Sequence, residues 1–168
     1  LILASYTRSA FHVQALHVLM VADGCEVKKE ELVRLLDMAV LEGFLLNNVG
    51  SWTYRFAHDR IQQAAYSLVK SGKSRDDLRR MIGTQLFELV ENGEGEDWML
   101  FVAADHLNSC SIHGGYSLTL AKLNLLCGEK ANVVAAYVPA SMYLQLAMKS
   151  LRKSKDHWES QYDLSLRL

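Results

Sequence analysis

The sequence is poor in residues that break helices or staple small domains. It contains one proline, ten glycines and three cysteines in 168 residues. So little proline and glycine excludes a collagen-like or linker-like chain and favours helices. The cysteines, Cys25, Cys110 and Cys127, are odd in number and lack CxxC spacing, and no Asn-x-Ser/Thr sequon is present. This pattern is typical of the reducing cytoplasm, where cysteines serve as small buried residues.

An excess of charge of either sign is also absent. Lys and Arg number 18 against 19 Asp and Glu, which gives a net charge of −1. This balance removes any bulk electrostatic case for nucleic-acid or membrane binding, and we expect neither as a partner. Half of the residues are apolar, which excludes a disordered chain. The length suits one domain, or two small ones, with a buried core.

No targeting or membrane segment stands out. The uncharged run 131–148 is diluted by Asn132, Pro139 and Gln145, and it predicts a buried pair of helices rather than a membrane span. Residues 1–6 lack the basic flank and cleavage site of a signal peptide. Apolar, uncapped segments lie at both ends, so we expect an internal piece of a longer protein.

Residues 1–70 predict a winged-helix-like module. Apolar periodicity indicates three helices, at residues 1–4, 11–21 and 28–41. Gly43 is expected to end the third of these helices. Two apolar runs, 44–46 and 52–56, flank an Asn/Gly-rich turn and predict a β-hairpin. Three helices followed by a hairpin is the outline of a winged helix.

Residues 71–168 predict TPR-like antiparallel helical pairs. Helices are expected at residues 75–91, 98–107, 116–127 and 130–151. Gly128 is predicted to end the third, and Pro139 either to kink the fourth or to start a new helix in its first turn. Small residues spaced with aromatics let antiparallel helices approach closely. The sequence shows no clean repeat at the tetratricopeptide period, so the pairs are TPR-like rather than consensus repeats.

Motifs for catalysis, metals and phosphate are not assembled in the sequence. Residues 67–74 end in Gly-Lys-Ser but lack the first glycine and the preceding strand of a phosphate-binding loop, so we interpret them as a helix stop with an N-cap at Ser74. The six histidines form no HExxH motif and no zinc spacing with cysteine. We predict no catalytic residue, no metal site and no cofactor bound by this chain itself.

The third predicted helix argues for protein contact rather than DNA binding. Residues 28–42 carry four acidic side chains against three basic ones, a poor match for phosphates. The alternative, a DNA-binding winged helix of a transcription activator, predicts an electrophoretic shift at low salt. A purely structural helical scaffold is a second alternative.

One segment passes from the second hairpin strand into a helix. His58 and Asp59 lie at this junction, where Asp59 is a natural N-cap. A histidine at a helix start is disfavoured as a cation, so we expect His58 to be neutral and able to donate one N–H. The same position also attracts phosphate. From the spacing alone, a capped helix with a partly buried histidine is the favoured interpretation of this pattern.

This segment, Phe56 to Tyr66, resembles the F-x-H-D-R-I-Q-Q-A-A-Y signature of the STAND signalling ATPases. The similarity is greatest to large multidomain sensor kinases that carry an AAA-like ATPase module beside histidine-kinase or serine/threonine-kinase regions. Further blocks resemble the family in the same order, at residues 41–45, 105–108, 120–125 and 128–131.

The resemblance implies a winged helix leading into TPR-like repeats, C-terminal to a nucleotide-binding core. His58 and Asp59 match the His-Asp of the M-H-D motif in plant resistance proteins, whose histidine contacts the nucleotide phosphate; Phe-Ala precedes His58 here. The resemblance therefore implies nucleotide sensing by these two residues, with ATP or ADP and Mg²⁺ bound by an upstream ATPase domain of the same protein. Other signalling proteins of the phosphorelay would bind the helical repeats.

Overall fold

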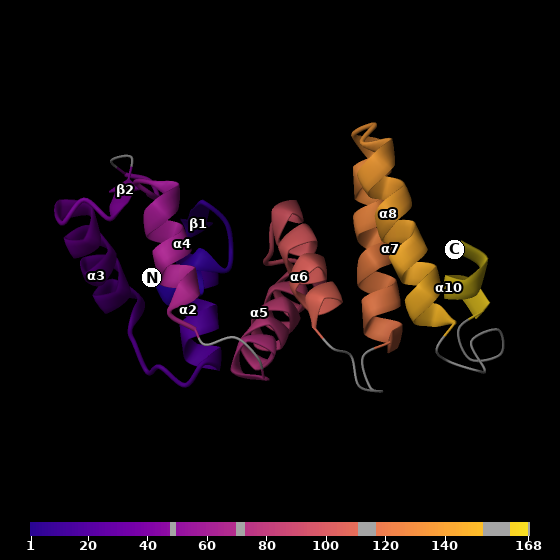
Figure 1. The fold of residues 1–168 in the computed structure, drawn as a ribbon, viewed down its shortest axis with the longest axis horizontal. Helices are drawn as coiled ribbons and strands as arrows, with labels where there is room; N and C mark the ends of the chain where they lie inside the picture. Colours follow the sequence, from indigo (N-terminus) through magenta and orange to yellow (C-terminus); the bar gives the residue numbers. More distant parts are fainter. Residues whose placement is uncertain (48–49, 70–72, 111–116, 153–161, 168) are drawn as a thin grey trace. The chain divides into compact units, whose positions relative to one another are not determined.

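The computed structural model describes residues 1–47, 50–69, 73–110, 117–152 and 162–167 (Figure 1). These residues are mainly helical, with a small antiparallel sheet, and this confirms the predicted mainly α fold class with a short hairpin. Contacts divide the chain into two compact units, Leu1–Gln85 and Leu86–Leu168. This division falls within the helix Lys73–Glu91, which follows the predicted domain boundary at 70/71. The assignments of a winged-helix-like module and of TPR-like pairs stay predictions.

The first unit alternates short helices with three short strands. In chain order its elements are α1 (Ile2–Ser5), β1 (Ala10–His12), α2 (Val13–Ala22), α3 (Lys29–Leu41), β2 (Leu45–Asn47), β3 (Thr53–Phe56), α4 (Asp59–Ser67) and the first part of α5 (Lys73–Glu91). Three helices therefore precede the hairpin, as predicted. Because α5 begins at Lys73, Ser74 lies inside its first turn, so the predicted N-cap at Ser74 is wrong.

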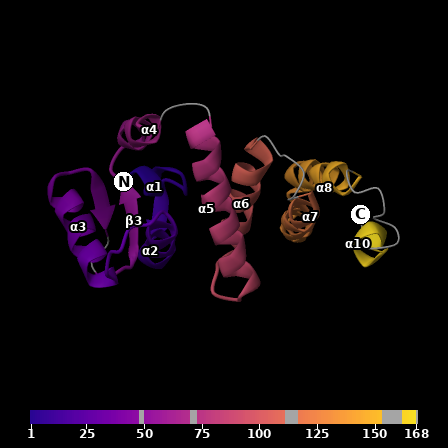
Figure 2. The ribbon, with the colours of Figure 1, turned by 90° about the horizontal axis from the view of Figure 1, so that it is seen from below.

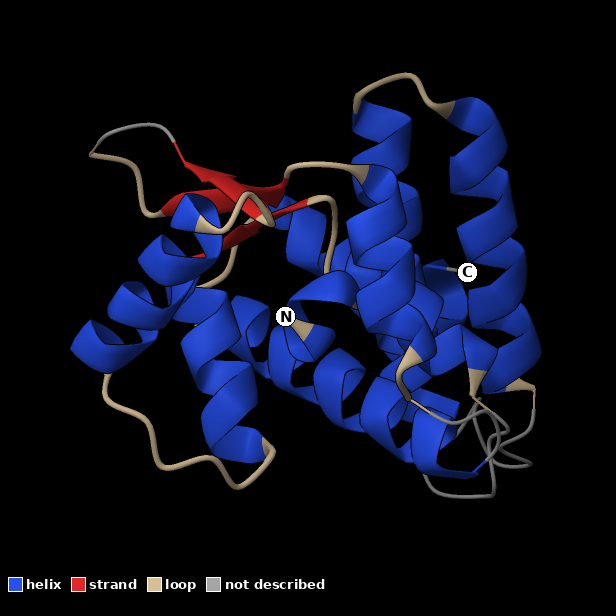
Figure 3. Ribbon diagram, turned by 60° about the vertical axis from the view of Figure 1, so that its left-hand side comes forward, coloured by secondary structure: helices blue, strands red, loops and turns tan. Residues whose placement is uncertain are grey.

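The sheet has the strand order β1-β3-β2, with β3 in the centre (Figure 3). Phe11 of β1 pairs with Tyr54, and Leu45 of β2 pairs with Phe56. Inward-facing side chains alternate along β3, as predicted from its sequence. The predicted helix at 11–21 is wrong at its start, because Phe11 is in β1 and the helix begins at Val13. A strand as short as β1 cannot show a period of two in the sequence.

The core of the first unit lies between the sheet and the helices. The Phe11 ring packs on Tyr54 and Phe56, with centroids 6.3 and 5.9 Å apart. Leu19 of α2 and Leu45 of β2 are also fully buried in this unit. Burial of these apolar side chains is the main term that stabilises the unit, because each contributes about 1.5–3 kcal/mol.

Glycine ends α3 as predicted. Gly43 has a φ of 76°, its N–H donates to the Val40 carbonyl, and the Phe44 N–H donates to the Ala39 carbonyl. This pair of bonds is a Schellman motif, which needs a left-handed residue after the helix. The prediction for Gly43 is confirmed.

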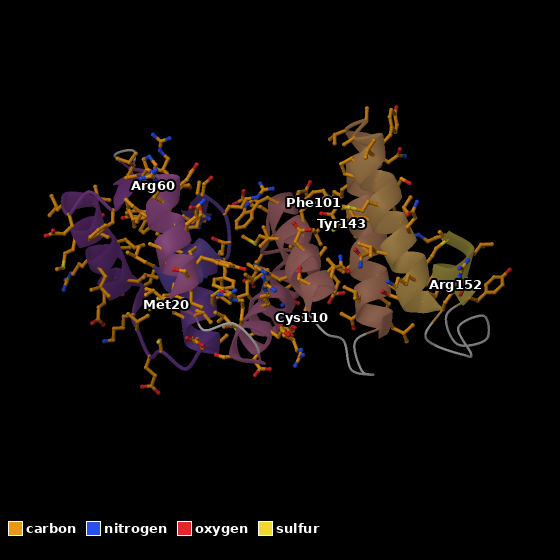
Figure 4. All side chains as sticks on the ribbon, in the orientation of Figure 1. Met20, Arg60, Phe101, Cys110, Tyr143 and Arg152 are labelled. Atoms are coloured by element: carbon orange, nitrogen blue, oxygen red, sulfur yellow. The ribbon has the colours of Figure 1, made fainter. Side chains whose placement is uncertain are left out.

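The second unit contains the rest of α5, then α6 (Asp97–Ser109), α7 (Ser117–Val133), α8 (Tyr137–Leu151) and α10 (Tyr162–Arg167). Helices α7 and α8 lie side by side over their lengths (Figures 1 and 2). Figure 4 shows Phe101 of α6 beside Tyr143 of α8, with ring centroids 5.8 Å apart. The Tyr143 hydroxyl also donates to Asp105 Oδ1 at 3.0 Å.

Gly128 does not end α7, so that prediction is wrong. The helix continues to Val133, and a Cβ placed on Gly128 would lie 2.7 Å from Leu144 Cγ of α8. The glycine is needed because the two helices approach each other closely, a non-local reason that no local stop signal reveals.

The predicted helix at 130–151 is two helices. A turn at 134–136 separates α7 from α8, and Pro139 lies in the first turn of α8, the second of its two predicted roles. The uncharged run 131–148 covers the last residues of α7, the turn and most of α8, so the predicted helix pair is found only in part within it. It is not buried throughout, since Val133, Val138 and Tyr137 are 84%, 83% and 68% exposed. No helix within the described ranges has both the length and the apolarity to cross a bilayer.

Candidate functional site

The predicted site lies where β3 leads into α4. Phe56, the last residue of β3, is buried and anchors the junction. His58 has an extended backbone, with φ −151° and ψ 144°, and its ring Nδ1 accepts a hydrogen bond from the Arg60 N–H at 3.1 Å. His58 is therefore the N-cap of α4.

Asp59 was predicted to cap this helix, and the structure corrects this. Asp59 is already the first helical residue of α4. An N-cap residue has a non-helical backbone, and its side chain accepts a hydrogen bond from the backbone N–H two or three positions later. His58 meets that requirement. The Asp59 carboxylate lies instead in the first turn, where the positive end of the helix dipole favours a negative charge.

The capping bond defines what the imidazole of His58 can do. Nδ1 must be unprotonated to accept from Arg60, so the neutral ring carries its proton on Nε2. His58, Asp59 and Arg60 are all exposed. Figure 4 shows Arg60 at the beginning of α4. The junction thus presents an N–H donor and a helix N-terminus to the outside.

Helix α4 is fastened to α1 by two residues of the signature. The Gln62 amide Nε2 donates to the Ser5 carbonyl at 3.2 Å. The Tyr66 ring stacks on Tyr6, with centroids 4.3 Å apart and an interplanar angle of 25°. These contacts hold the end of α1 against the side of α4.

Tyr66 also joins α4 to α5. Its hydroxyl accepts a hydrogen bond from Arg79 Nη2 at 2.6 Å, and the Arg75 guanidinium lies 5.2 Å from its ring centroid. Along α4, Ala65 is buried, whereas Ala64 and Leu68 are exposed. The inward face of α4 is therefore built around Tyr66, and the helix rests on α1 and α5 through polar and ring contacts.

Two other blocks of the resemblance meet in the second unit. Asn108 of α6 and Asn124 of α7 exchange hydrogen bonds between their side-chain amides, at 2.9 and 3.0 Å. Cys127, on the same helix as Asn124, is buried; burial first, and the nearby Asp105 charge second, raise the pKa of its thiol to about 12. A thiol held protonated in this way is not a nucleophile. Asn108, Asn124 and Cys127 therefore have a structural role in the packing of α6 and α7.

The described residues do not bring metal ligands together into a binding site. No group of three or more His, Cys, Asp or Glu among those residues could hold a metal ion. His113 and His157 lie outside the described residues, as do residues 70–72 of the Gly-Lys-Ser segment.

Comparisons of the chain with protein-family models, curated proteins and solved structures found no match. The resemblance to the signalling ATPases therefore depends on the sequence blocks quoted above, of which Phe56–Tyr66 is the most specific.

Proposed function

We propose that this chain is a regulatory and interaction module of a multidomain signalling ATPase-kinase. It reports the nucleotide state of an upstream ATPase core to the signal output, and its helical pairs bind other signalling proteins. The observation that supports this proposal is the Phe56–Tyr66 signature with His58 exposed at the head of α4.

The chemistry of the junction suits contact with a phosphate. An imidazole Nε2–H and the first turn of a helix are both donors to an anionic oxygen. Asp59 beside them is a negative charge, and its repulsion would make the contact sensitive to the number of phosphates on the nucleotide. ATP or ADP with Mg²⁺ would be held by the core, and this chain would supply only the sensing contact.

In this proposal, α4 transmits the nucleotide contact made by His58 to the rest of the module. Tyr66 lies at its other end and binds Arg79 of α5. Helix α5 contains residues of both compact units. A shift of α4 on α5 would therefore change the surface with which the helical pairs bind other signalling proteins. The ADP-bound state would be the off state, stabilised by His58.

The test uses the full-length protein with its ATPase core. His58→Ala removes both the cap and the imidazole, whereas His58→Asn keeps a capping acceptor and removes only the imidazole. We expect both variants to release ADP faster and to raise basal output, because both lose the phosphate contact. The exposed Gln63 of the same helix provides the control variant Gln63→Ala, for which we expect no change.

The outcome that contradicts the proposal is specific. Wild-type ADP release and output in His58→Asn, together with a defect in His58→Ala, would show that the residue acts only as a helix cap. Unchanged behaviour of both variants would remove His58 from regulation altogether.

A further inference from the structure

A pocket of about 470 Å³ lies between α3 and the β2–β3 hairpin. This volume is within the range of sites that enclose a small ligand or a large side chain. Its polar lining includes Asp37 of α3, Asn47 of β2 and Tyr54 of β3. Neither the capping contact of His58 nor the signature helix contributes to it.

The pocket offers a carboxylate with one oxygen in use. The Tyr54 hydroxyl donates to Asp37 Oδ1 at 2.6 Å, and this bond fixes the orientation of the carboxylate. Asp37 forms no salt bridge with any residue that the structure describes. Burial first, and the hydrogen bond and charge of Asp37 next, raise the pKa of Tyr54 to about 12, so the phenol stays a donor. Oδ2 is therefore the oxygen that can accept from a ligand.

Asn47 adds a second acceptor. Its side-chain Oδ1 is a buried atom that has no hydrogen-bond partner among the described parts of the chain. A buried acceptor without a donor costs free energy, which a bound N–H group would recover. Both acceptors call for a ligand that is rich in donors.

The walls of the pocket suit a cation on an aliphatic stem. Val33 and Val40 provide apolar lining, and Trp52, which is 53% exposed, forms part of the rim. The ammonium of Lys29 lies 5.1 Å from the centroid of the Trp52 ring, so this indole already binds one cation through its π system. Leu41, on the same helix as Asp37, is 86% exposed.

We propose that this pocket binds the guanidinium of an arginine side chain presented by a protein partner. A guanidinium has several N–H donors in one plane and can serve Asp37 and Asn47 together, which a single ammonium does less well. Its methylene stem would contact Val33 and Val40. Trp and Arg are both enriched in protein-interface hot spots, so an arginine beside the exposed Trp52 fits a protein partner. The acceptor oxygens of the pocket would repel a nucleic-acid phosphate.

The guanidinium chemistry is tested on the whole chain with capped single residues. N-acetyl-arginine methylamide is titrated against the protein while NMR follows the Asn47 side-chain amide and the Trp52 indole signals. We expect saturable shifts at both sites and at least ten-fold weaker binding of the citrulline analogue, which has nearly the same shape without the charge. Equal binding of the two compounds, or no shift at Asn47 and Trp52, would overturn the proposal.

Two variants distinguish binding in the pocket from an unspecific attraction by the acidic side chains of α3. Asp37→Asn keeps an oxygen for the Tyr54 hydroxyl and removes the charge, and we expect at least ten-fold weaker binding. Glu42→Gln removes an exposed charge from the C-cap of the same helix, outside the pocket lining, and we expect a change of less than two-fold. Circular dichroism verifies that both variants fold. Equal effects of the two substitutions would contradict a specific site.

The source of the arginine is tested by one further comparison. A short peptide with leucine on both sides of the arginine should bind at least ten-fold more tightly than the capped residue, because Leu41 and Trp52 lie exposed to meet it. A peptide that binds no more tightly would show that the pocket takes a free guanidinium compound and would overturn the protein-partner proposal. Neither result depends on His58, so this test and that of nucleotide sensing can fail separately.

Discussion

Asn108 and Asn124 bind each other through both groups of their side-chain amides. Each Nδ2 donates to the other residue's Oδ1, and Asn124 Nδ2 donates in addition to the Leu120 carbonyl at 2.9 Å. Asn124 is fully buried. A buried amide with all these partners fixes the register of α6 on α7, because a shifted helix would leave polar groups without hydrogen bonds.

Replacing Asn124 should therefore cost much of the stability of the second unit. We expect Asn124→Ala to lower the free energy of unfolding by about 2–4 kcal/mol, since it leaves Asn108 unpaired and opens a cavity. The matched control is Asn132→Ala, on the exposed side of the same helix, with an expected change within about 0.5 kcal/mol. Urea unfolding measures both. Similar losses for the two variants would contradict the role of the pair.

Ala135 ends α7 in a conformation that suits glycine. Its φ is 58°, and the Ala135 and Ala136 N–H groups donate to the Asn132 and Ala131 carbonyls in a Schellman motif. Ala135→Gly should raise stability by about 0.5–1 kcal/mol, because the left-handed strain exceeds the entropy cost of glycine. Gly93, with a φ of 77° at the end of α5, allows the reverse substitution, glycine to alanine, as the control.

For Gly93→Ala we expect a loss of about 1 kcal/mol from the backbone alone, because no atom lies within 4 Å of the added Cβ. Thermal or urea unfolding of the two variants would show shifts of opposite sign. Shifts of the same sign would mean that the backbone angles do not govern these helix ends.

The glycine at the α7–α8 contact should not tolerate a methyl group. A Cβ on Gly128 would lie 2.7 and 2.8 Å from Leu144 Cγ and Cδ2, so Gly128→Ala should destabilise the protein by about 1–3 kcal/mol although alanine is the better helix former. Adding Leu144→Ala should recover part of this loss in a double-mutant cycle. A stabilising effect of Gly128→Ala would show that the two helices are not closely packed there.

Alkaline pH should weaken the first unit through Tyr54. Burial and Asp37 raise the pKa of its phenol from 10.0 to about 12. Between these values the unfolded state has lost the proton and the folded state keeps it, so stability is complete below about pH 10 and falls as the pH rises towards 12. Urea unfolding across this range should show a smaller decline for Tyr54→Phe than for the exposed control Tyr162→Phe. Identical slopes would refute the assignment.

Local signals in the sequence determined much of the secondary structure. Charges and leucines alternate with a helical period along α3, and Gly43 follows at the position where a left-handed residue is needed. Alternation predicted the buried Tyr54 and Phe56 of β3. The signature also located the strand-to-helix junction at His58, because residue types at a helix start are set by local capping.

Only the tertiary structure decided the features that depend on a distant partner. Phe11 joins a strand because β3 lies beside it, and Gly128 is needed because Leu144 of the following helix lies against it in space. The pocket of Asp37, Asn47 and Tyr54 draws on a helix and two strands, so no sequence spacing revealed it. Patterns along the chain report what a residue does within its own helix or strand; packing brings together residues whose separation in sequence carries no signal.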